Sequence, residues 1–161
     1  MAKILFVVAQ KGFRDEELLV PKEMLERAGH TVRIASITRA KAIGSRGAEL
    51  SPDMAMYEAN PEFFECVVIV GGPGSPVLSE TKEVLGFVRA MHDKGKIVSA
   101  ICLGPVVLAK AGVLAGKNAT VFPDRKAILL LRECGARYIM EPVVVDGMVV
   151  MASGSRPLDV K

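Results

Sequence analysis

The sequence is poor in the residues that build metal centres and disulfide frameworks. Its 161 residues include three cysteines, two histidines and no tryptophan. Cys66, Cys102 and Cys134 are far apart, and none belongs to a C-x-x-C pair. Disulfide scaffolds show an even set of cysteines, and structural zinc sites usually show paired ones. We therefore expect no disulfide framework, no metal ion and no other cofactor.

A strong charge bias and a long hydrophobic run are also missing. The 21 basic and 18 acidic residues leave a net charge of +3, and the basic residues are scattered. Nucleic-acid binding usually needs a basic stripe with aromatic residues in it, so no such partner is expected. The apolar start of the chain, 1–8, is too short to span a membrane and lacks a signal-peptide cleavage pattern. It is interpreted as a buried first strand of a cytoplasmic protein that has no membrane partner.

Short apolar runs alternate with helical patterns along the whole chain. Strands are expected at 3–8, 32–36, 66–70, 97–101, 119–121, 143–145 and 148–151. Helices are expected at 16–28, 79–94, 104–112 and 124–134, and short strands joined by turns at 40–56. This alternation predicts one α/β domain over 1–161, a doubly wound, mostly parallel sheet with helices on both faces. The turn Asp146-Gly147 between two apolar runs predicts a hairpin at its end.

The first expected helix carries the least regular pattern. Asp15 is expected to cap it, and Gly29 is expected to end it. Pro21 lies inside the helix, where proline is tolerated only near the first turn or at a kink. Its inner face is expected to consist of Leu18, Leu19, Met24 and Leu25.

Cys102 is the residue on which a functional interpretation depends. It follows the strand 97–101 directly, and Gly104-Pro105 opens a helix immediately afterwards. A residue at such a sharp strand-to-helix turn is exposed at the top of the sheet, as in the nucleophile elbow of hydrolases. The helix N-terminus favours a thiolate, which is the nucleophilic form. A lone cysteine is more often a small buried core residue, but the turn favours a reactive role here.

Two further segments are expected at the same edge of the sheet, because they also follow strands. Gly71-Gly72 can present backbone N–H groups to an oxyanion, although an ordinary tight turn would look the same. The run Asp15-Glu16-Glu17 suits a helix N-terminus on electrostatic grounds alone. One of its carboxylates could instead meet Cys102, and spacing does not say which.

These motifs together resemble the ThiJ/PfpI family of the class I glutamine amidotransferase-like group. The resemblance rests on 100–105 (Ala-Ile-Cys-Leu-Gly-Pro), 70–72 (Val-Gly-Gly), and Glu17 four residues before Pro21, and it covers nearly the whole chain. It implies a flavodoxin-like fold in which Cys102 is the nucleophile and Glu17 contacts its sulfur. It also implies an oxyanion hole made by the amides of Gly71, Gly72 and Leu103, and substrate contacts from Phe122 and Pro123. Members of the family commonly form homodimers or larger homo-oligomers.

The sequence departs from the family pattern where histidine is usual. Leu103 follows the cysteine directly, and Phe122 stands before Pro123, so no Cys-His pair is visible. His30 and His92 are expected in a turn and late in a helix, away from the site. The chain also stops soon after the segment 153–157, and the C-terminal helix of the family is expected to be missing.

Three functions therefore remain open. The first is a glyoxalase- or deglycase-type enzyme that acts on small carbonyls through Cys102 and Glu17. The second is a non-catalytic redox sensor or chaperone that uses oxidation of Cys102. The third is an intracellular cysteine peptidase or amidase, which the absence of a Cys-His dyad makes less favourable.

Overall fold

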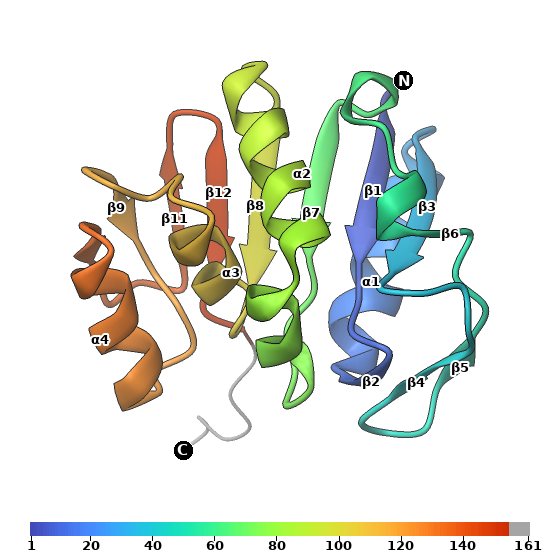
Figure 1. Cartoon of the computed structure of the whole chain (residues 1–161), viewed down its shortest axis with the longest axis horizontal. Helices are drawn as coiled ribbons and strands as arrows, with labels where there is room; N and C mark the ends of the chain where they lie inside the picture. Colours follow the sequence, from blue (N-terminus) through green and yellow to red (C-terminus); the bar gives the residue numbers. More distant parts are fainter. Residues whose placement is uncertain (155–161) are drawn as a thin grey trace.

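A seven-stranded sheet with helices on both faces dominates the structure (Figure 1). The computed structural model describes residues 1–154. The strand order is β11-β12-β8-β7-β1-β3-β6, and all neighbouring strands are parallel except β11 and β12. The strands are β1 (Lys3–Val7), β3 (Thr31–Ser36), β6 (Met54–Ala55), β7 (Cys66–Ile69), β8 (Ile97–Ile101), β11 (Val143–Asp146) and β12 (Val149–Ala152). The doubly wound, mostly parallel sheet expected from the sequence is confirmed.

The helices divide unevenly between the two faces of the sheet. In Figure 1, α2 and α3 cross in front of the sheet and α1 lies behind it. The α-helices are α1 (Asp15–Arg27), α2 (Lys82–Asp93), α3 (Pro105–Lys110) and α4 (Arg125–Glu133). Short 3-10 helices are η1 (Met56–Glu58), η2 (Pro61–Phe63) and η3 (Ser75–Glu80). No helix of residues 1–154 is long and apolar enough to cross a membrane.

The alternation of side chains along each strand creates two separate cores. On β1, Leu5 and Val7 point into the larger core under α2 and α3. Ile4 and Phe6, their neighbours in the sequence, point into the smaller core under α1. The strand therefore buries both its faces, as its continuous apolar run predicts.

Two small sheets lie beside the main one. The strands β2 (Lys11–Phe13), β4 (Ala42–Gly44) and β5 (Glu49–Leu50) form one of them, and β9 (Asn118–Ala119) pairs with β10 (Arg137–Tyr138) in the other. The expected short strands at 40–56 are confirmed, whereas β2 and β10 were not predicted. Both missed strands are only two or three residues long, too short for an alternation pattern to reveal them.

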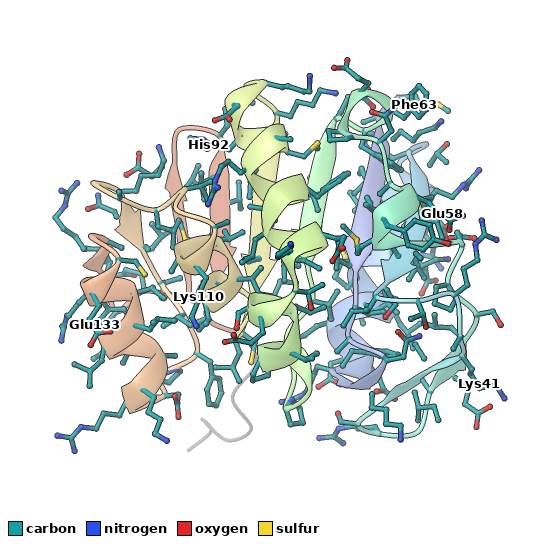
Figure 2. The ribbon with its side chains drawn as sticks, in the orientation of Figure 1. Lys41, Glu58, Phe63, His92, Lys110 and Glu133 are labelled. Atoms are coloured by element: carbon teal, nitrogen blue, oxygen red, sulfur yellow. The ribbon has the colours of Figure 1, made fainter. Side chains whose placement is uncertain are left out.

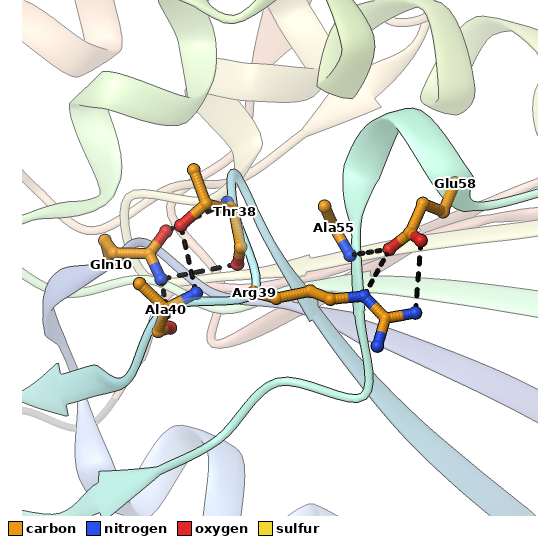
Figure 3. A network of polar contacts seen from close by, with 6 residues as sticks. All are labelled: Gln10, Thr38, Arg39, Ala40, Ala55 and Glu58. Atoms are coloured by element: carbon orange, nitrogen blue, oxygen red, sulfur yellow. Dashed lines mark hydrogen bonds and ion pairs between the residues drawn. The ribbon is translucent and has the colours of Figure 1, made fainter.

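Side-chain hydrogen bonds attach the loop after β3 to the loop after β1 (Figure 3). Gln10 Nε2 donates to the Ala40 carbonyl at 2.5 Å, and the Thr38 amide donates to Gln10 Oε1 at 3.1 Å. Arg39 and Glu58 form a bidentate pair at 2.7 and 3.1 Å in the same region. These contacts fix the segment that leads into the β4–β5 hairpin.

The first helix differs from expectation in its cap and in its inner face. The capping position is Arg14, and Asp15 is a buried first residue whose carboxylate accepts from the amides of Arg46 at 3.1 Å and Ala48 at 2.9 Å. Asp15 therefore anchors the β4–β5 hairpin. Leu18 is buried, but Leu19 and Met24 are exposed, so half of the expected inner face is wrong.

The remaining helices lie close to their expected positions. The helix expected at 79–94 is split into η3 and α2, which begins at Lys82. Asp124 caps α4 by accepting from the Ala127 amide at 3.0 Å, and the hairpin around Asp146-Gly147 is present. The chain beyond residue 154, where a final helix is expected to be missing, lies outside the described residues.

Candidate active site

Cys102 occupies a strained backbone turn at the carboxyl end of β8. Its φ is +63°, the left-handed region, and it is the one residue other than glycine with a positive φ among residues 1–154. Such a conformation costs about 1–2 kcal/mol for a residue that carries a Cβ. Two hydrogen bonds hold it: the Cys102 amide donates to the Ala152 carbonyl at 2.9 Å, and the Phe122 amide donates to the Cys102 carbonyl at 2.7 Å. The sharp strand-to-helix turn predicted from the sequence is therefore confirmed.

Glu17 reaches this turn from the first turn of α1 and is almost fully buried, with 5% of its surface exposed. Its Oε1 accepts a hydrogen bond from the Gly71 amide at 3.1 Å. Its Oε2 is buried without a hydrogen bond in the described part of the chain, and the carboxyl group interacts with the Cys102 thiol. Among the three acidic residues of this turn, Glu17 is thus the one that meets the cysteine.

The glycine pair after β7 allows the three loops to approach one another. A Cβ at Gly71 would lie 2.7 Å from Cys102 Cβ and 2.9 Å from Glu17 Oε1, so only glycine fits between these side chains. Gly72 has a φ of +115°, and a Cβ there would lie 2.5 Å from the Arg14 amide nitrogen. The Arg14 amide in turn donates to the Gly71 carbonyl at 2.9 Å. The predicted convergence of the loops after β1, β7 and β8 is confirmed.

Two of the three amides expected in the oxyanion hole face the cysteine. The backbone N–H groups of Gly72 and Leu103 interact with the Cys102 sulfur and favour its anionic form. The Gly71 amide does not take part, because its hydrogen bond goes to Glu17 Oε1. For Gly71 the expectation is corrected: its amide positions the carboxyl group.

The electrostatics of the pair differ from the expected low-pKa thiolate. Burial, and then the negative charge of Glu17, raise the pKa of Cys102 to about 12, against the opposing effect of the Leu103 and Gly72 amides. Burial also raises the pKa of Glu17, while the Gly71 hydrogen bond, the Arg14 charge and the thiol lower it. The helix that was expected to favour the thiolate, α3, has only six residues. Desolvation therefore outweighs the helix N-terminus, and the two groups titrate as a coupled pair.

Neither histidine contributes to this arrangement. His92 lies in the last turn of α2, towards the amino ends of the strands (Figure 2), and its Nδ1 is 4.0 Å from Asp93 Oδ1. His30 Nδ1 accepts a hydrogen bond from the Ala2 amide at 2.9 Å. Leu103 and Phe122 stand beside Cys102 in the positions where the resemblance would place a histidine. Within residues 1–154, no cluster of three or more His, Cys, Asp or Glu side chains could hold a metal ion.

A cavity of about 350 Å³ lies beside Gly154, a residue that packs against Cys102. Gly154 forms part of its wall, and a Cβ at Gly154 would lie 3.3 Å from Cys102 Sγ. Pro123 also lines this cavity, whereas Phe122 touches the site through its backbone amide. The other lining residues are Thr120, Val121, Tyr138, Met140, Glu141, Pro142 and Ser153. Gly154 was missed from the sequence because it follows β12, which is distant from the motif around Cys102.

Comparison with known proteins gives a consistent set of matches. The sequence pattern of the DJ-1/PfpI family matches residues 2–159. An uncharacterised protein of Methanocaldococcus jannaschii is 44% identical over 152 residues, which cover 94% of this chain and 74% of that protein. A protein of Pyrococcus horikoshii named a deglycase is 35% identical over 145 residues, which cover 90% of this chain and 86% of that protein.

Solved structures show the same fold. The crystal structure of a ThiJ/PfpI domain protein from Brachyspira murdochii superposes with a TM-score of 0.90 at 32% identity, covering 94% of this chain and 87% of that one. The crystal structure of Drosophila melanogaster DJ-1beta gives a TM-score of 0.84 at 29% identity, covering 94% of this chain and 82% of that one.

Proposed function

Because the chain belongs to the DJ-1/PfpI family, we propose that it is a cysteine-dependent enzyme that acts on small reactive carbonyls, as a glyoxalase or deglycase does. The observation that carries the proposal is the buried pair of Glu17 and Cys102, with the Gly72 and Leu103 amides directed at the sulfur. Relatives from Pyrococcus horikoshii and Thermococcus kodakarensis are named deglycases.

The reaction starts from a thiol because burial raises the pKa of Cys102. For a dicarbonyl such as methylglyoxal, the sulfur bonds to the aldehyde carbon while the thiol proton passes through the Glu17 carboxylate to the carbonyl oxygen. This gives a hemithioacetal without any change in net charge. The Gly72 and Leu103 amides stabilise the negative charge that develops on the oxygen during the addition.

The second stage is an internal proton transfer that also uses Glu17. The carboxylate removes the proton from the former aldehyde carbon and returns a proton to the neighbouring carbon, while the hydroxyl proton of the hemithioacetal moves to the neighbouring carbonyl oxygen; the adduct thereby becomes the thioester of a 2-hydroxy acid. Water then hydrolyses the thioester, releasing a hydroxy acid and restoring the thiol. The overall reaction adds one water to the dicarbonyl, and it needs neither an oxidant nor a histidine.

The raised pKa values explain why the two groups would serve this chemistry. A carboxyl group whose pKa is raised towards neutrality accepts and returns protons more effectively than an exposed one. The pKa of Cys102 is raised as well, so both carbonyl addition and oxidation at the sulfur require removal of the thiol proton, for which Glu17 is the neighbouring acceptor. The peptidase hypothesis lacks a histidine near Cys102.

The test compares turnover of methylglyoxal by the wild-type chain and by Cys102→Ser. Turnover is measured from the lactate that appears in NMR spectra. We expect turnover in the wild type and none in Cys102→Ser. Cys66→Ser is the control, because Cys66 is likewise a free thiol but is half-buried at the amino end of β7, whereas Cys102 is buried and follows the carboxyl end of β8. Equal rates in the wild type and Cys102→Ser would end the proposal.

A further inference from the structure

Glu17 lies in the part of α1 that the helix itself holds least firmly. The capping residue, Arg14, forms no side-chain cap hydrogen bond. Pro21 has no N–H group, so it cannot donate to the carbonyl of Glu17 four residues earlier, where a helix normally forms a backbone hydrogen bond. Helix ends are also where fraying begins. The backbone of Glu17 therefore depends on contacts from outside the helix.

Asp15 supplies a buried contact of this kind. It lies two residues before Glu17, and only 9% of its surface is exposed. Its Oδ1 accepts from the Arg46 amide at 3.1 Å, and its Oδ2 accepts from the Ala48 amide at 2.9 Å. Hydrogen bonds to a carboxylate are stronger than those between neutral groups. Both oxygens of one side chain thus tie the first turn of α1 to the β4–β5 hairpin.

The hairpin has room for this carboxylate and is itself held in place. A Cβ at Gly44 would lie 1.9 Å from Asp15 Oδ1, and Gly44 does not have a positive φ. The space that this glycine leaves is therefore taken by the carboxylate. The Ser45 amide donates to the Phe13 carbonyl at 2.8 Å, and β4 pairs with β2 (Figure 1). The hairpin is thus fixed to the segment that leads into α1.

Glu16, the residue between Asp15 and Glu17, does not replace this anchor. Its Oε2 accepts from Arg14 Nε at 2.7 Å, and its Oε1 lies 4.0 Å from Arg46 Nε. The side chains of Glu16 and Arg46 are 38% and 68% exposed, and exposed ion pairs contribute little to stability. The three acidic residues of this turn therefore face different groups: Asp15 the hairpin, Glu16 the arginines and Glu17 the cysteine.

We infer that Asp15 is a positioning residue: by fixing the first turn of α1 to the β4–β5 hairpin, it holds the Glu17 carboxyl group against the Cys102 thiol. The Gly71 amide holds one carboxylate oxygen of Glu17 at 3.1 Å. That single bond orients the side chain, whereas Asp15 fixes the backbone that carries it. What Glu17 is positioned for, the transfer of the thiol proton, rests on the proposed function.

Alkylation of Cys102 by iodoacetamide tests the inference without any substrate. Burial and the charge of Glu17 both oppose the thiolate, so displacement of Glu17 should let Cys102 react faster. We expect Asp15→Asn to raise the alkylation rate about tenfold, the effect of lowering the thiol pKa by one unit. Asparagine keeps the size of the side chain but can accept a hydrogen bond at only one of its two ends.

Two further variants make the result specific. Asp53→Asn is the matched control, because Asp53 Oδ2 likewise accepts a backbone amide, that of Ile34 at 2.8 Å, but ties the start of β6 to β3. Its alkylation rate should equal that of the wild type. Gly44→Ala disturbs the same anchor from the hairpin, because the added Cβ would displace the Asp15 carboxylate. It should accelerate alkylation as Asp15→Asn does, and circular dichroism checks that each variant folds.

A double-mutant cycle with Glu17→Gln distinguishes positioning from a general loosening of the site. If Asp15 acts through Glu17, Asp15→Asn should accelerate alkylation in the wild type and add little in the Glu17→Gln background. Equal acceleration in both backgrounds would overturn the inference. So would an unchanged rate in both Asp15→Asn and Gly44→Ala, or an equal rise in Asp53→Asn.

Methylglyoxal turnover by the same variants separates this inference from the proposed function. Asp15→Asn should lower kcat with little change in KM, because it displaces a proton-transfer group and leaves substrate contacts in place. Non-additive alkylation rates in a chain that shows no turnover would support the positioning role and overturn the proposed function. Turnover that needs Glu17, together with additive alkylation rates, would do the reverse.

Discussion

Glu17 and Gly71 lie 54 residues apart, and the Gly71 amide donates a hydrogen bond to Glu17 Oε1 at 3.1 Å. This contact fixes one carboxylate oxygen of a carboxyl group that also interacts with the Cys102 thiol, and the second oxygen is buried without a hydrogen bond in the described part of the chain. The carboxyl group therefore has a structural role, as the acceptor of the Gly71 amide, and a proposed chemical role towards Cys102. Substitutions can separate the two.

Glu17→Gln should keep the fold and lose the chemistry. The Gln side-chain oxygen can still accept from the Gly71 amide, but the amide group cannot take the thiol proton. We expect methylglyoxal turnover to fall about 10²- to 10⁴-fold, while the Gly71 hydrogen bond and the fold are kept. Glu17→Ala should in addition lose about 1–3 kcal/mol of stability, because the buried Gly71 amide loses its acceptor. Equal stability of the two variants would contradict the structural role.

The stability of the protein should depend on pH through Glu17. Burial raises its pKa in the folded state, so the folded protein binds this proton more tightly than the unfolded chain does. The free energy of unfolding should therefore fall as pH rises from the ordinary pKa of a glutamate to the raised value. Glu17→Gln has no such proton, and its stability relative to the wild type should increase over that interval. Chemical denaturation at a series of pH values measures this, and a constant difference would contradict it.

Cys102 should react slowly with alkylating agents in the folded protein. With a pKa of about 12, only a very small fraction is thiolate near neutral pH. Glu17→Gln removes the second cause of the raised pKa, so alkylation of Cys102 should become faster. Cys66 is the internal control, because burial alone raises its pKa to about 11. Mass spectrometry of the labelled peptides measures the alkylation rate of each cysteine. An equal increase in the rates of Cys102 and Cys66 in Glu17→Gln would contradict this interpretation.

Gly72→Ala should destabilise the protein much more than Gly29→Ala. Both glycines have a positive φ, so both substitutions carry a backbone cost of about 1–2 kcal/mol. At Gly29 nothing lies within 4 Å of the added Cβ, whereas at Gly72 it would meet the Arg14 nitrogen and the Gly12 oxygen at 2.5 Å. The difference between the two melting temperatures isolates the close approach of the loops. Similar melting temperatures would show that the loop after β1 moves without cost.

The sequence predicted what depends on local pattern and strand order. Cys102 could be placed at a turn because a buried apolar strand ends beside Gly104-Pro105, and parallel strands bring their carboxyl ends together. The local sequence pattern could not reveal that Asp15 is not the capping residue of α1. Its hydrogen-bond partners, Arg46 and Ala48, lie in a hairpin 31 and 33 residues away. The sequence also did not predict that the pKa of Cys102 is raised, because the raised pKa results from burial of the thiol by several elements.

The exposed Leu19 and Met24 illustrate the same limit. A helical pattern identifies an apolar stripe, but it does not say how much of the stripe its own sheet will cover. Here α1 covers β1 and β3, and the strands beyond β7 have no helix over this face among residues 1–154. The exposure of Leu19 and Met24 therefore depends on how α1 packs on the sheet, which the pattern of the helix alone does not determine.

The left-handed backbone at Cys102 sets stability and reactivity against each other at one position. Glycine adopts this conformation without penalty, so Cys102→Gly would relieve strain while deleting the sulfur. Selection for thermal resistance alone would therefore tend to erase the thiol. A chain with cysteine at position 102 is therefore less stable in its backbone than the same chain with glycine there. The difference in the free energy of unfolding between the two is the stability given up to keep a thiol at this turn.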